Sequence, residues 1–346
     1  MKDKIEKAKR IIFVVSGGVG RNIFATAVVR NLKKAYPNKD IILVCGCPDV
    51  FQNNPYTKRI YSFDKPQHLF EDYIFENSDS VIIDVEPYRH PEYIAGTKHI
   101  IECWCDMLEI PCDSIKPELF FVKSEKEMSQ AYLTKYKKPL ILIQHIGGKA
   151  PEKATPQDRI MAKDSMYRRG LNENTVQKLV NLLRADGYLV GCVQHPNQFL
   201  PKDAELIHFP LRATMGLIPY VEGIICIDSF LQHASAALDI KSLVCWAGTN
   251  PDKLGYPTHI NMRRKSCLTP ECHRPNSYAF DIQPSGAMWS CPYSEECSNY
   301  EAEEILNTYK ELKGDRYTEA TKTKEEEQIE IVEEKKEIDC DSCKGE

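Results

Sequence analysis

The chain has 346 residues, 42% of them hydrophobic and 27% charged, which is typical of a folded globular protein of two domains. The last 33 residues carry 12 acidic and 6 basic side chains, whereas the rest of the chain has 39 basic and 38 acidic ones. A nearly neutral body argues against a broad nucleic-acid-binding surface, and no apolar run reaches the roughly 18 residues of a membrane span.

The N-terminus and the cysteines predict the compartment. The apolar run 11–15 is too short for the core of a signal peptide. Fourteen cysteines spread through a chain of this length are typical of reduced thiols rather than of a secreted disulfide scaffold. We therefore expect a cytoplasmic protein without a membrane span, and peripheral membrane association stays open.

The first part of the chain alternates short apolar strands with helices. Residues 11–16 predict a strand that ends at a glycine loop, and the apolar spacing over 22–36 predicts a helix that stops before Pro37. Further strands are predicted at 41–45, 59–61 and 80–84, and further helices at 98–108 and, opened by a capping box, at 124–136. Such alternation predicts a parallel sheet covered on both faces.

The pattern restarts at residue 139. The predicted strands are 140–144, 188–193, 223–227 and 241–246, and the predicted helices are 172–186, 211–220, 230–238 and 301–312. We therefore predict an α/β chain with two Rossmann-like domains, 1–136 and 137–313. An acidic tail, 314–346, follows as a disordered segment or a solvated helix.

The loop Gly17-Gly18-Val19-Gly20 lies between a strand and a helix, where backbone amides and the helix dipole favour an anion. A nicotinamide-dinucleotide site would place an acidic residue at the end of the second strand. Cys45-Gly46-Cys47 stands there instead, which argues against such a site.

Two stretches resemble the family 9 glycosyltransferases, the heptosyltransferase group. In residues 17–61 a glycine loop enters a helix that ends in an Ala-Tyr-Pro turn, and Asn54-Pro55 follows the second strand. Residues 227–251 are similar to the donor-binding element of that family, which they match at Asp228, Ser229, His233, Ala236, Ala237, Thr249 and Pro251. The resemblance implies a GT-B fold, in which two Rossmann-like domains with parallel sheets face a cleft.

The resemblance also implies an activity and a site. It implies an inverting, metal-independent transfer of a sugar from a nucleotide-sugar donor, ADP-heptose or another, to a glycan, lipid-linked or other biopolymer acceptor. The implied donor-binding residues are Arg168, Arg169, Asp228, Ser229, His233, Thr249 and Asn250, and the implied acceptor loop contains Gly17, Gly18, Gly20, Arg21 and Asn22. The alternatives are that Asp228 and Ser229 only cap a helix, and that the two arginines are a solvated pair.

The sequence departs from the family at two positions. The family has an aspartate after the glycine loop as the base, whereas this chain has Arg21, which cannot act as a base at neutral pH. Phe230 replaces a glycine of the donor motif. We therefore expect Asp84 or Glu86, at the end of the fourth strand, to be the base. The alternatives are a binding protein without activity and a sugar-nucleotide epimerase.

Cysteines near the C-terminus raise the question of a metal. A structural zinc could be held by Cys267, Cys272, His273, Cys291 and Cys297, but the spacings are looser than those of paired C-x₂-C motifs. We therefore expect no cofactor and keep structural zinc as the alternative. Cys103 and Cys105, on either side of Trp104, are predicted to be packing residues.

Overall fold

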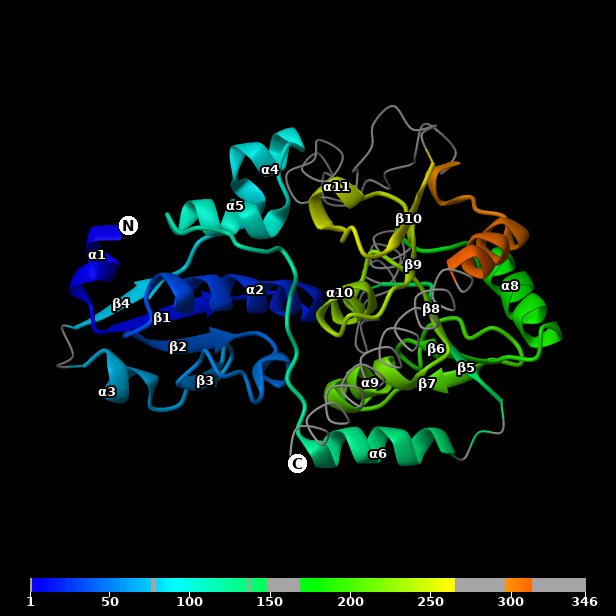
Figure 1. The fold of residues 1–346 in the computed structure, drawn as a ribbon, viewed down its shortest axis with the longest axis horizontal. Coiled ribbons are helices and arrows are strands. Elements are labelled where there is room, and N and C mark those ends of the chain that lie inside the picture. The colour runs from blue at the N-terminus through cyan, green and yellow to red at the C-terminus, as the bar shows by residue number, and fades with distance from the viewer. Residues whose placement is uncertain are drawn as a thin grey trace, which may run out of the picture.

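The structure, a computed structural model, describes residues 2–75, 79–134, 136, 138–147, 169–264 and 296–312. Within these residues the chain forms two lobes, each built on a parallel sheet (Figure 1). The α/β fold with two parallel sheets predicted from the sequence is thus confirmed. The acidic tail, 314–346, lies outside the described residues.

The first sheet has four parallel strands in the order β3-β2-β1-β4. They are β1 (Arg10–Val15), β2 (Asp40–Cys45), β3 (Arg59–Ser62) and β4 (Ser80–Ile83). One face packs against α2 (Val19–Ala35) and α5 (Ile100–Met107), and the other face carries the short helix α3 (Leu69–Tyr73). Phe13 of β1 contacts Trp104 of α5 in the first of these layers, at a ring distance of 5.6 Å. Cys103 and Cys105, which were predicted to be packing residues, are buried on either side of Trp104.

Short elements fill the remainder of the first lobe. They are α1 (Lys2–Lys7), η1 (Pro48–Phe51), η2 (Pro87–Arg89) and α4 (Pro91–Ala95). The connection after α5 runs down the boundary between the lobes to α6 (Lys123–Thr134), as Figure 1 shows. The capping box predicted at Ser124 is wrong, because α6 begins one residue earlier and the Glu125 carboxylate accepts from the Val122 N–H.

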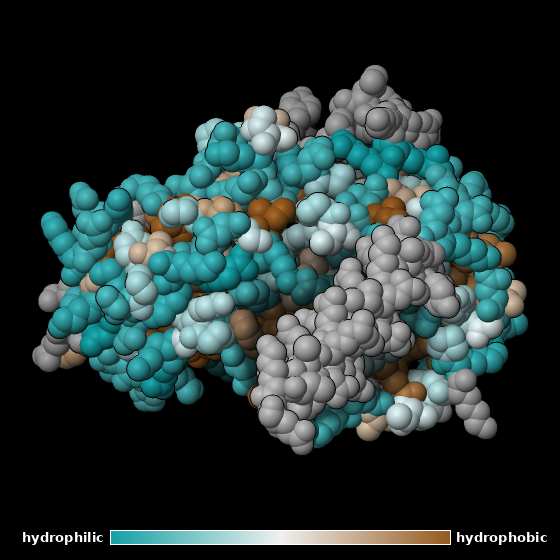
Figure 2. Space-filling view, in the orientation of Figure 1, coloured by the Kyte–Doolittle hydropathy of each residue, from teal (hydrophilic) through white to brown (hydrophobic). Residues whose placement is uncertain are grey.

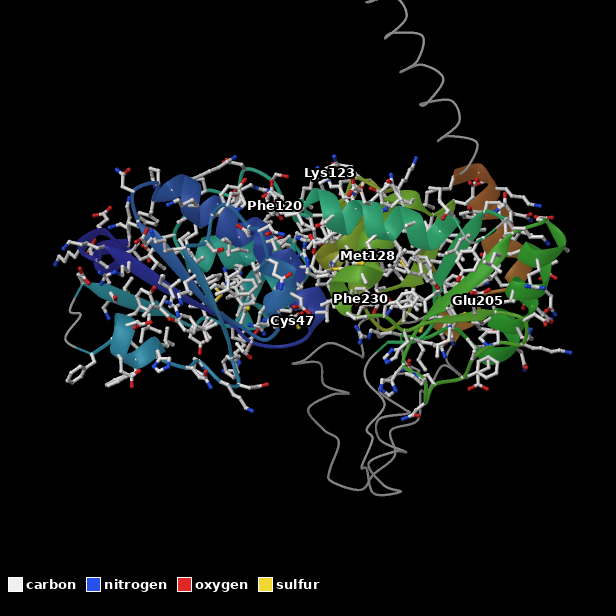
Figure 3. The ribbon with its side chains drawn as sticks, turned by 90° about the horizontal axis from the view of Figure 1, so that it is seen from below. Cys47, Phe120, Lys123, Met128, Glu205 and Phe230 are labelled. Atoms are coloured by element: carbon white, nitrogen blue, oxygen red, sulfur yellow. The ribbon has the colours of Figure 1, made fainter. Side chains whose placement is uncertain are left out.

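α6 lies along the second lobe, with Lys123 at its start and Met128 in its middle (Figure 3). The guanidinium of Arg212, in α9 (Leu211–Leu217), donates to Glu125 of α6 at 2.8 Å. The domain boundary between residues 136 and 137 stays a prediction, and we propose that α6 moves together with the second lobe.

The second sheet has six parallel strands in the order β10-β9-β8-β5-β6-β7. They are β5 (Leu140–Gln144), β6 (Leu189–Val193), β7 (Glu205–Ile207), β8 (Gly223–Ile227), β9 (Leu243–Trp246) and β10 (Ile260–Arg263). α8 (Glu173–Ala185) and the helix 302–312 cover one face, and α9 and α10 (Phe230–Ala237) cover the other. The sequence did not predict β7 and β10, because each has only three or four residues and polar side chains interrupt them.

In both sheets the order in which strands are added reverses at the first strand, β1 or β5. The chain passes from β1 to β2 and β3 on one side and then to β4 on the other, and it repeats this from β5 to β6 and β7 and then to β8. Ligands of open α/β sheets bind outside the carboxyl ends of the strands at such a reversal. The loops after β1, β4, β5 and β8 are therefore where a binding site is expected.

The lobes meet where α2 and α10 approach one another at the centre of the molecule (Figure 1). A Cβ atom added at Gly20 of α2 would lie 2.9 Å from His233 Cδ2 of α10, so glycine permits this contact. Lys253, in α11 (Pro251–Leu254), reaches the first lobe, where its ammonium lies 5.0 Å from the centre of the Tyr93 ring. One apolar core therefore runs through both lobes.

The outer surface shown in Figure 2 is mostly hydrophilic, with small separate apolar areas. Among the described residues, no helix combines the length and the apolar character that crossing a membrane requires.

Candidate functional site

A cleft of about 840 Å³ lies between the two lobes. Its walls come from the loops at the carboxyl ends of both sheets, as expected from the strand order. Figure 3 shows Cys47 of the first lobe and Phe230 of the second at their facing ends, and both line the cleft.

The cleft brings together most of the predicted site residues. Those that line it are Gly17, Gly18, Gly20, Arg21, Arg169, Asp228, Ser229, His233 and Thr249. Those that do not are Asn22, Asp84, Glu86 and Asn250. Arg168 lies outside the described residues.

The glycine loop is shaped by Asn22. Its buried side-chain amide donates to the carbonyls of Gly17 at 3.1 Å and Gly18 at 2.9 Å, and its Oδ1 accepts from the Cys47 N–H at 3.2 Å. A Cβ atom at Gly46 would lie 2.4 Å from the Gly17 carbonyl oxygen, so only glycine fits there. Asn22 therefore holds the loop instead of facing a ligand. Asn22 lies in the first turn of α2, which begins at Val19, three residues earlier than predicted.

Arg21 forms part of the first lobe's wall. Its Nη1 donates to Glu86 Oε2 at 2.8 Å, and its guanidinium lies 5.3 Å from the centre of the Trp104 ring and 5.6 Å from that of Tyr88. The side chain is only 12% exposed. A cation is therefore fixed at the cleft where the sequence resemblance would place a carboxylate.

The two candidate bases follow β4 but differ in position. Asp84 is exposed. Glu86 is half-buried, accepts from the Tyr88 N–H at 3.3 Å, and contacts the cleft residue Arg21. Glu86 is thus linked to the cleft through Arg21.

The second lobe's wall is built around the turn at Asp228, at the end of β8. Asp228 is 3% exposed, and its Oδ1 accepts from Gln232 Nε2 at 2.8 Å. Arg169 Nη1 donates to the Asp228 carbonyl at 3.1 Å and lies 3.8 Å from its carboxylate. Ser229 is the N-cap residue of α10, but its side chain makes no capping hydrogen bond. The simple capping alternative therefore does not describe Ser229.

His233 lies one turn into α10 and is 4% exposed. Its Nδ1 lies 2.8 Å from the Tyr256 hydroxyl, and its ring packs edge-on against Phe24 of α2 at 5.6 Å. Burial lowers the pKa of His233 to about 4, although the nearby Asp228 carboxylate acts in the opposite direction. The imidazole is therefore neutral at pH 7.

Thr249 and Asn250 follow β9 and face different surroundings. Thr249 lines the cleft at 9% exposure, and its Oγ1 has no hydrogen-bond partner among the described residues. Asn250 Oδ1 instead accepts from the Asp252 N–H and from Arg263 Nη1, both at 3.0 Å. Thr249 thus carries a buried hydroxyl without a partner among the described residues at the cleft wall, whereas Asn250 caps α11.

Several residues that line the cleft were not predicted from the sequence. From the ends of β6 and β7 come Gln194, His195, Gln198, His208 and Phe209, and from the first lobe come Phe24, Tyr88 and Tyr93. The rings of His195 and His208 pack edge to face at 5.4 Å. Gln194 and His195 directly follow a predicted strand, a signal that could have found them. His208 follows β7, which the sequence did not reveal.

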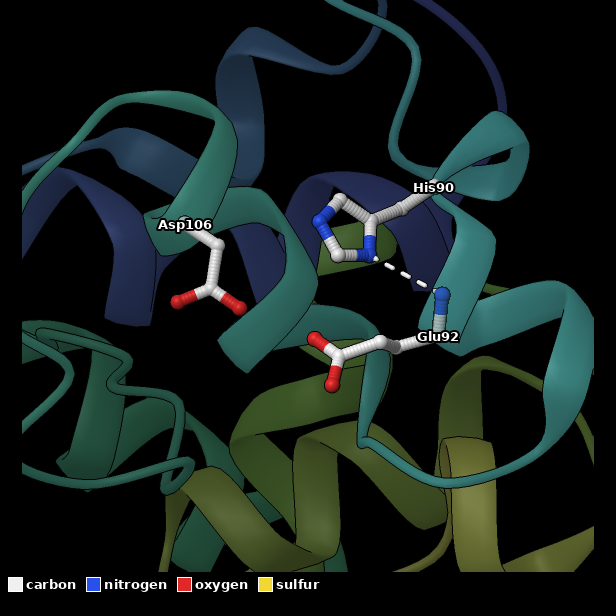
Figure 4. Close-up of side chains that lie close together, drawn as sticks. All are labelled: His90, Glu92 and Asp106. Carbon is white, nitrogen blue, oxygen red and sulfur yellow. Dashed lines mark hydrogen bonds between the residues drawn. The ribbon is translucent and has the colours of Figure 1, made fainter.

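The predicted cysteine cluster lies mostly beyond what the structure describes: Cys297 is half-buried, and Cys267, Cys272 and Cys291 fall outside the described residues. The described chain does gather three potential ligands, His90, Glu92 and Asp106, whose ligand atoms lie within 4.8 Å of one another (Figure 4). Lys98 Nζ, however, lies 2.8 Å from Glu92 and 2.7 Å from Asp106. The Lys98 ammonium already compensates the negative charge of these two carboxylates, so we assign no metal there.

The chain is similar over most of its length to solved glycosyltransferase structures. A family 9 glycosyl transferase from Veillonella parvula is 14% identical, with 89% of this chain and 98% of that chain covered and a TM-score of 0.64. ADP-heptose LPS heptosyltransferase II of E. coli is 13% identical, with 89% and 99% covered and a TM-score of 0.61. TibC, an iron-containing dodecameric glycosyltransferase from enterotoxigenic E. coli, is 13% identical, with 88% and 76% covered and a TM-score of 0.61.

This chain has the GT-B fold. The expectation drawn from the two sequence stretches is thereby confirmed for the fold. No family model matches the sequence, and no curated protein does either. Sequence identity to the GT-B structures is low, and a shared fold does not by itself determine the activity, which depends on the residues of the cleft.

Proposed function

We propose that this protein is a glycosyltransferase that holds a nucleotide-sugar in the cleft and transfers the sugar to a glycan, lipid-linked or other biopolymer acceptor. One observation carries the proposal: the turn at Asp228 opens into an interlobe cleft beside Arg169 and the unpartnered hydroxyl of Thr249. These groups are all suited to a diphosphate, which carries negative charge and many hydrogen-bond acceptors.

The donor is held without a metal in this proposal. Ser229 and Phe230 open α10 at the cleft, where the helix dipole favours an anion, and Arg169 supplies a planar set of donors. Arg168, next to it in the sequence, remains part of the proposed phosphate site. A cleft of about 840 Å³ falls within the roughly 300–1,000 Å³ range of small-molecule sites.

The nucleoside would lie over the ends of β6 and β7. There Phe209 and the paired rings of His195 and His208 offer apolar faces, and Gln194 and Gln198 are polar. Because one structural neighbour is named for ADP-heptose, ADP-heptose is the first donor to test. We propose a cytosolic reaction, consistent with the free thiols among the described cysteines.

Transfer would proceed with inversion. An acceptor hydroxyl attacks the anomeric carbon from the side opposite the diphosphate, the bond to the diphosphate oxygen breaks, and a base takes the hydroxyl proton. Arg169 and the start of α10 stabilise the charge that develops on the departing diphosphate. Of the two candidate bases we favour Glu86 over Asp84, because Glu86 contacts the cleft residue Arg21.

A second candidate function is nucleotide-sugar binding without transfer. It is favoured by Arg21, which stands at the acceptor wall and pairs with the Glu86 carboxylate. Under this alternative the second lobe would bind the donor as proposed, and the first lobe would lack a free base.

Binding and turnover can be measured together to separate these functions. The melting temperature is recorded with ADP-heptose, with other nucleotide-sugars, with ADP and with the free sugar, and nucleotide release is followed with and without acceptor glycans. We expect a nucleotide-sugar to raise the melting temperature and nucleotide release to require an acceptor. A binding protein would give the shift alone, and an epimerase would alter the sugar without an acceptor. No stabilisation by any nucleotide-sugar at millimolar concentration would refute the proposed site.

A further inference from the structure

Cys105 and Cys112 lie side by side in the first lobe, and neither lines the cleft. The Asn31 side-chain nitrogen is 3.6 Å from Cys105 Sγ and 3.7 Å from Cys112 Sγ. Both are free cysteines, so two reduced thiols lie on the same amide nitrogen.

The backbone between them holds this arrangement. Cys105 lies in the last turns of α5, and Glu109 then adopts the left-handed conformation, with φ of 56°, which reverses the chain. The Ile110 N–H donates back to the Cys105 carbonyl at 3.1 Å. The turn therefore returns Cys112 to Cys105 within a single lobe, independently of how the two lobes move.

The two thiols differ in reactivity. Cys105 is fully buried, whereas Cys112 is half-buried. The neighbouring Cys105 thiol lowers the pKa of Cys112, although burial and the Glu102 carboxylate oppose this, and the nearby Arg30 guanidinium lowers it further. Arg30 is fixed there by hydrogen bonds to the carbonyls of Ser114 and Lys116, at 2.7 and 2.8 Å. Cys112 is thus the more accessible thiol of the two and the one whose pKa is lowered.

We propose that Cys105 and Cys112 are a redox-active pair that a peroxide converts into a disulfide. The Cys112 thiolate attacks one peroxide oxygen, the O–O bond breaks, and a sulfenic acid forms at Cys112 while the other oxygen leaves as water after taking a proton. Cys105 then attacks the Cys112 sulfur, the S–S bond forms, and the sulfenic oxygen leaves as a second water. Two thiols have lost two electrons and two protons to one peroxide.

Residue-resolved mapping of the full chain tests the pair. The reduced protein is treated with increasing hydrogen peroxide, remaining thiols are blocked with N-ethylmaleimide, and linked peptides are quantified by mass spectrometry. We expect the peptide joining Cys105 to Cys112 to form at lower peroxide than oxidation of Cys103, a buried thiol on the same helix whose pKa burial raises to about 12. Dithiothreitol should reverse the link.

Variants separate the two roles. Cys103→Ser should form the link as the wild type does, and Cys105→Ser should leave a sulfenic acid on Cys112 that dimedone labels. If Cys105 and Cys112 both remain alkylated at peroxide doses that oxidise other cysteines, or if either one pairs elsewhere, the proposal is wrong.

A measurement on the unaltered protein avoids any folding defect of a variant. Iodoacetamide at pH 7 should alkylate Cys112 at least about ten times faster than Cys47, which is similarly half-buried but whose pKa is raised by burial. Equal rates would contradict an activated Cys112.

Discussion

Arg21 Nη1 donates to Glu86 Oε2 at 2.8 Å, joining the first turn of α2 to the loop after β4. The two residues are 65 positions apart in the sequence, but β1 and β4 are neighbours in the sheet, and the loops that follow them meet. The contact keeps a carboxylate next to the cleft and gives it a cationic partner, so the proposed base has a defined position.

Glu86→Gln preserves the size of the side chain and removes its charge. If Glu86 takes the acceptor proton, the turnover rate should fall on the order of 10²–10⁴-fold while the donor dissociation constant stays unchanged. Initial rates of nucleotide release measure the turnover rate, and calorimetric titrations measure the donor dissociation constant. Asp113→Asn is a suitable control, because Asp113 is 51% exposed and pairs with Lys34. Full activity in the Asp84→Ala/Glu86→Ala double variant would rule out both carboxylates.

Arg169→Gln should weaken donor binding. A hydrogen bond to a charged group contributes about 1.5–3 kcal/mol, so the donor dissociation constant should rise roughly 10- to 100-fold, and its salt dependence should decrease. Calorimetry at two salt concentrations measures both effects. Arg184→Gln, which removes a hydrogen bond to the Asp203 carbonyl on the surface, serves as the matched control. Unchanged affinity in Arg169→Gln would place the phosphates elsewhere.

Thr249→Val replaces a hydroxyl by a methyl group of nearly the same shape. Because Thr249 Oγ1 has no partner among the described residues, stability should change little, whereas donor affinity should fall by about 1–2 kcal/mol. Thr249→Ser keeps the hydroxyl and should retain most of the affinity. Equal donor affinity in the valine and serine variants would show that the hydroxyl does not contact the donor.

Gly20→Ala tests the contact between the lobes. The added Cβ atom would lie 2.9 Å from His233 Cδ2, and the buried ring cannot move freely, so we expect destabilisation by about 1–3 kcal/mol in urea unfolding. Gly18→Ala is the control, because its Cβ atom would meet nothing within 4 Å. A Gly20→Ala variant as stable as Gly18→Ala would mean that α2 and α10 are further apart in solution.

His99 couples stability to pH. Its Nδ1 accepts from the Ile101 N–H at 3.3 Å as the cap of α5, and burial, with a contribution from His233, lowers its pKa to about 3. Below about pH 6.5, His99 is therefore protonated in the unfolded chain but stays neutral in the folded chain. The free energy of unfolding consequently decreases as the pH falls from 6.5 toward 3.

His99→Asn keeps a capping side chain and removes the titration. The free energy of unfolding of the variant should decline less between pH 6.5 and 4.5 than that of the wild type, by up to about 3 kcal/mol. Urea unfolding across this pH range measures the difference, to which the other buried histidines contribute equally in both proteins. Parallel curves would contradict the proposed role of His99.

The local pattern of the sequence was sufficient to predict the bounds of strands that are buried on both faces. The ranges of β5 and β8 match the predictions, because their continuous apolar residues are bounded by clear breaks. It was also sufficient for placing Asp228 and Thr249 at strand ends, since the carboxyl ends of parallel strands share one edge. It could not tell a ligand-facing polar side chain from one that serves the backbone, and so Asn22 and Asn250 were grouped with the site.

The sequence by itself thus determined the alternation of strands and helices, the two parallel sheets and the polar residues at their edges, because these follow from spacing along the chain. Only the tertiary structure decided that Glu86 meets Arg21, that Tyr256 holds His233, and that His195 faces His208. Those contacts depend on strand order and on the packing of two lobes, which bring together residues far apart in the sequence and leave no local periodic signal.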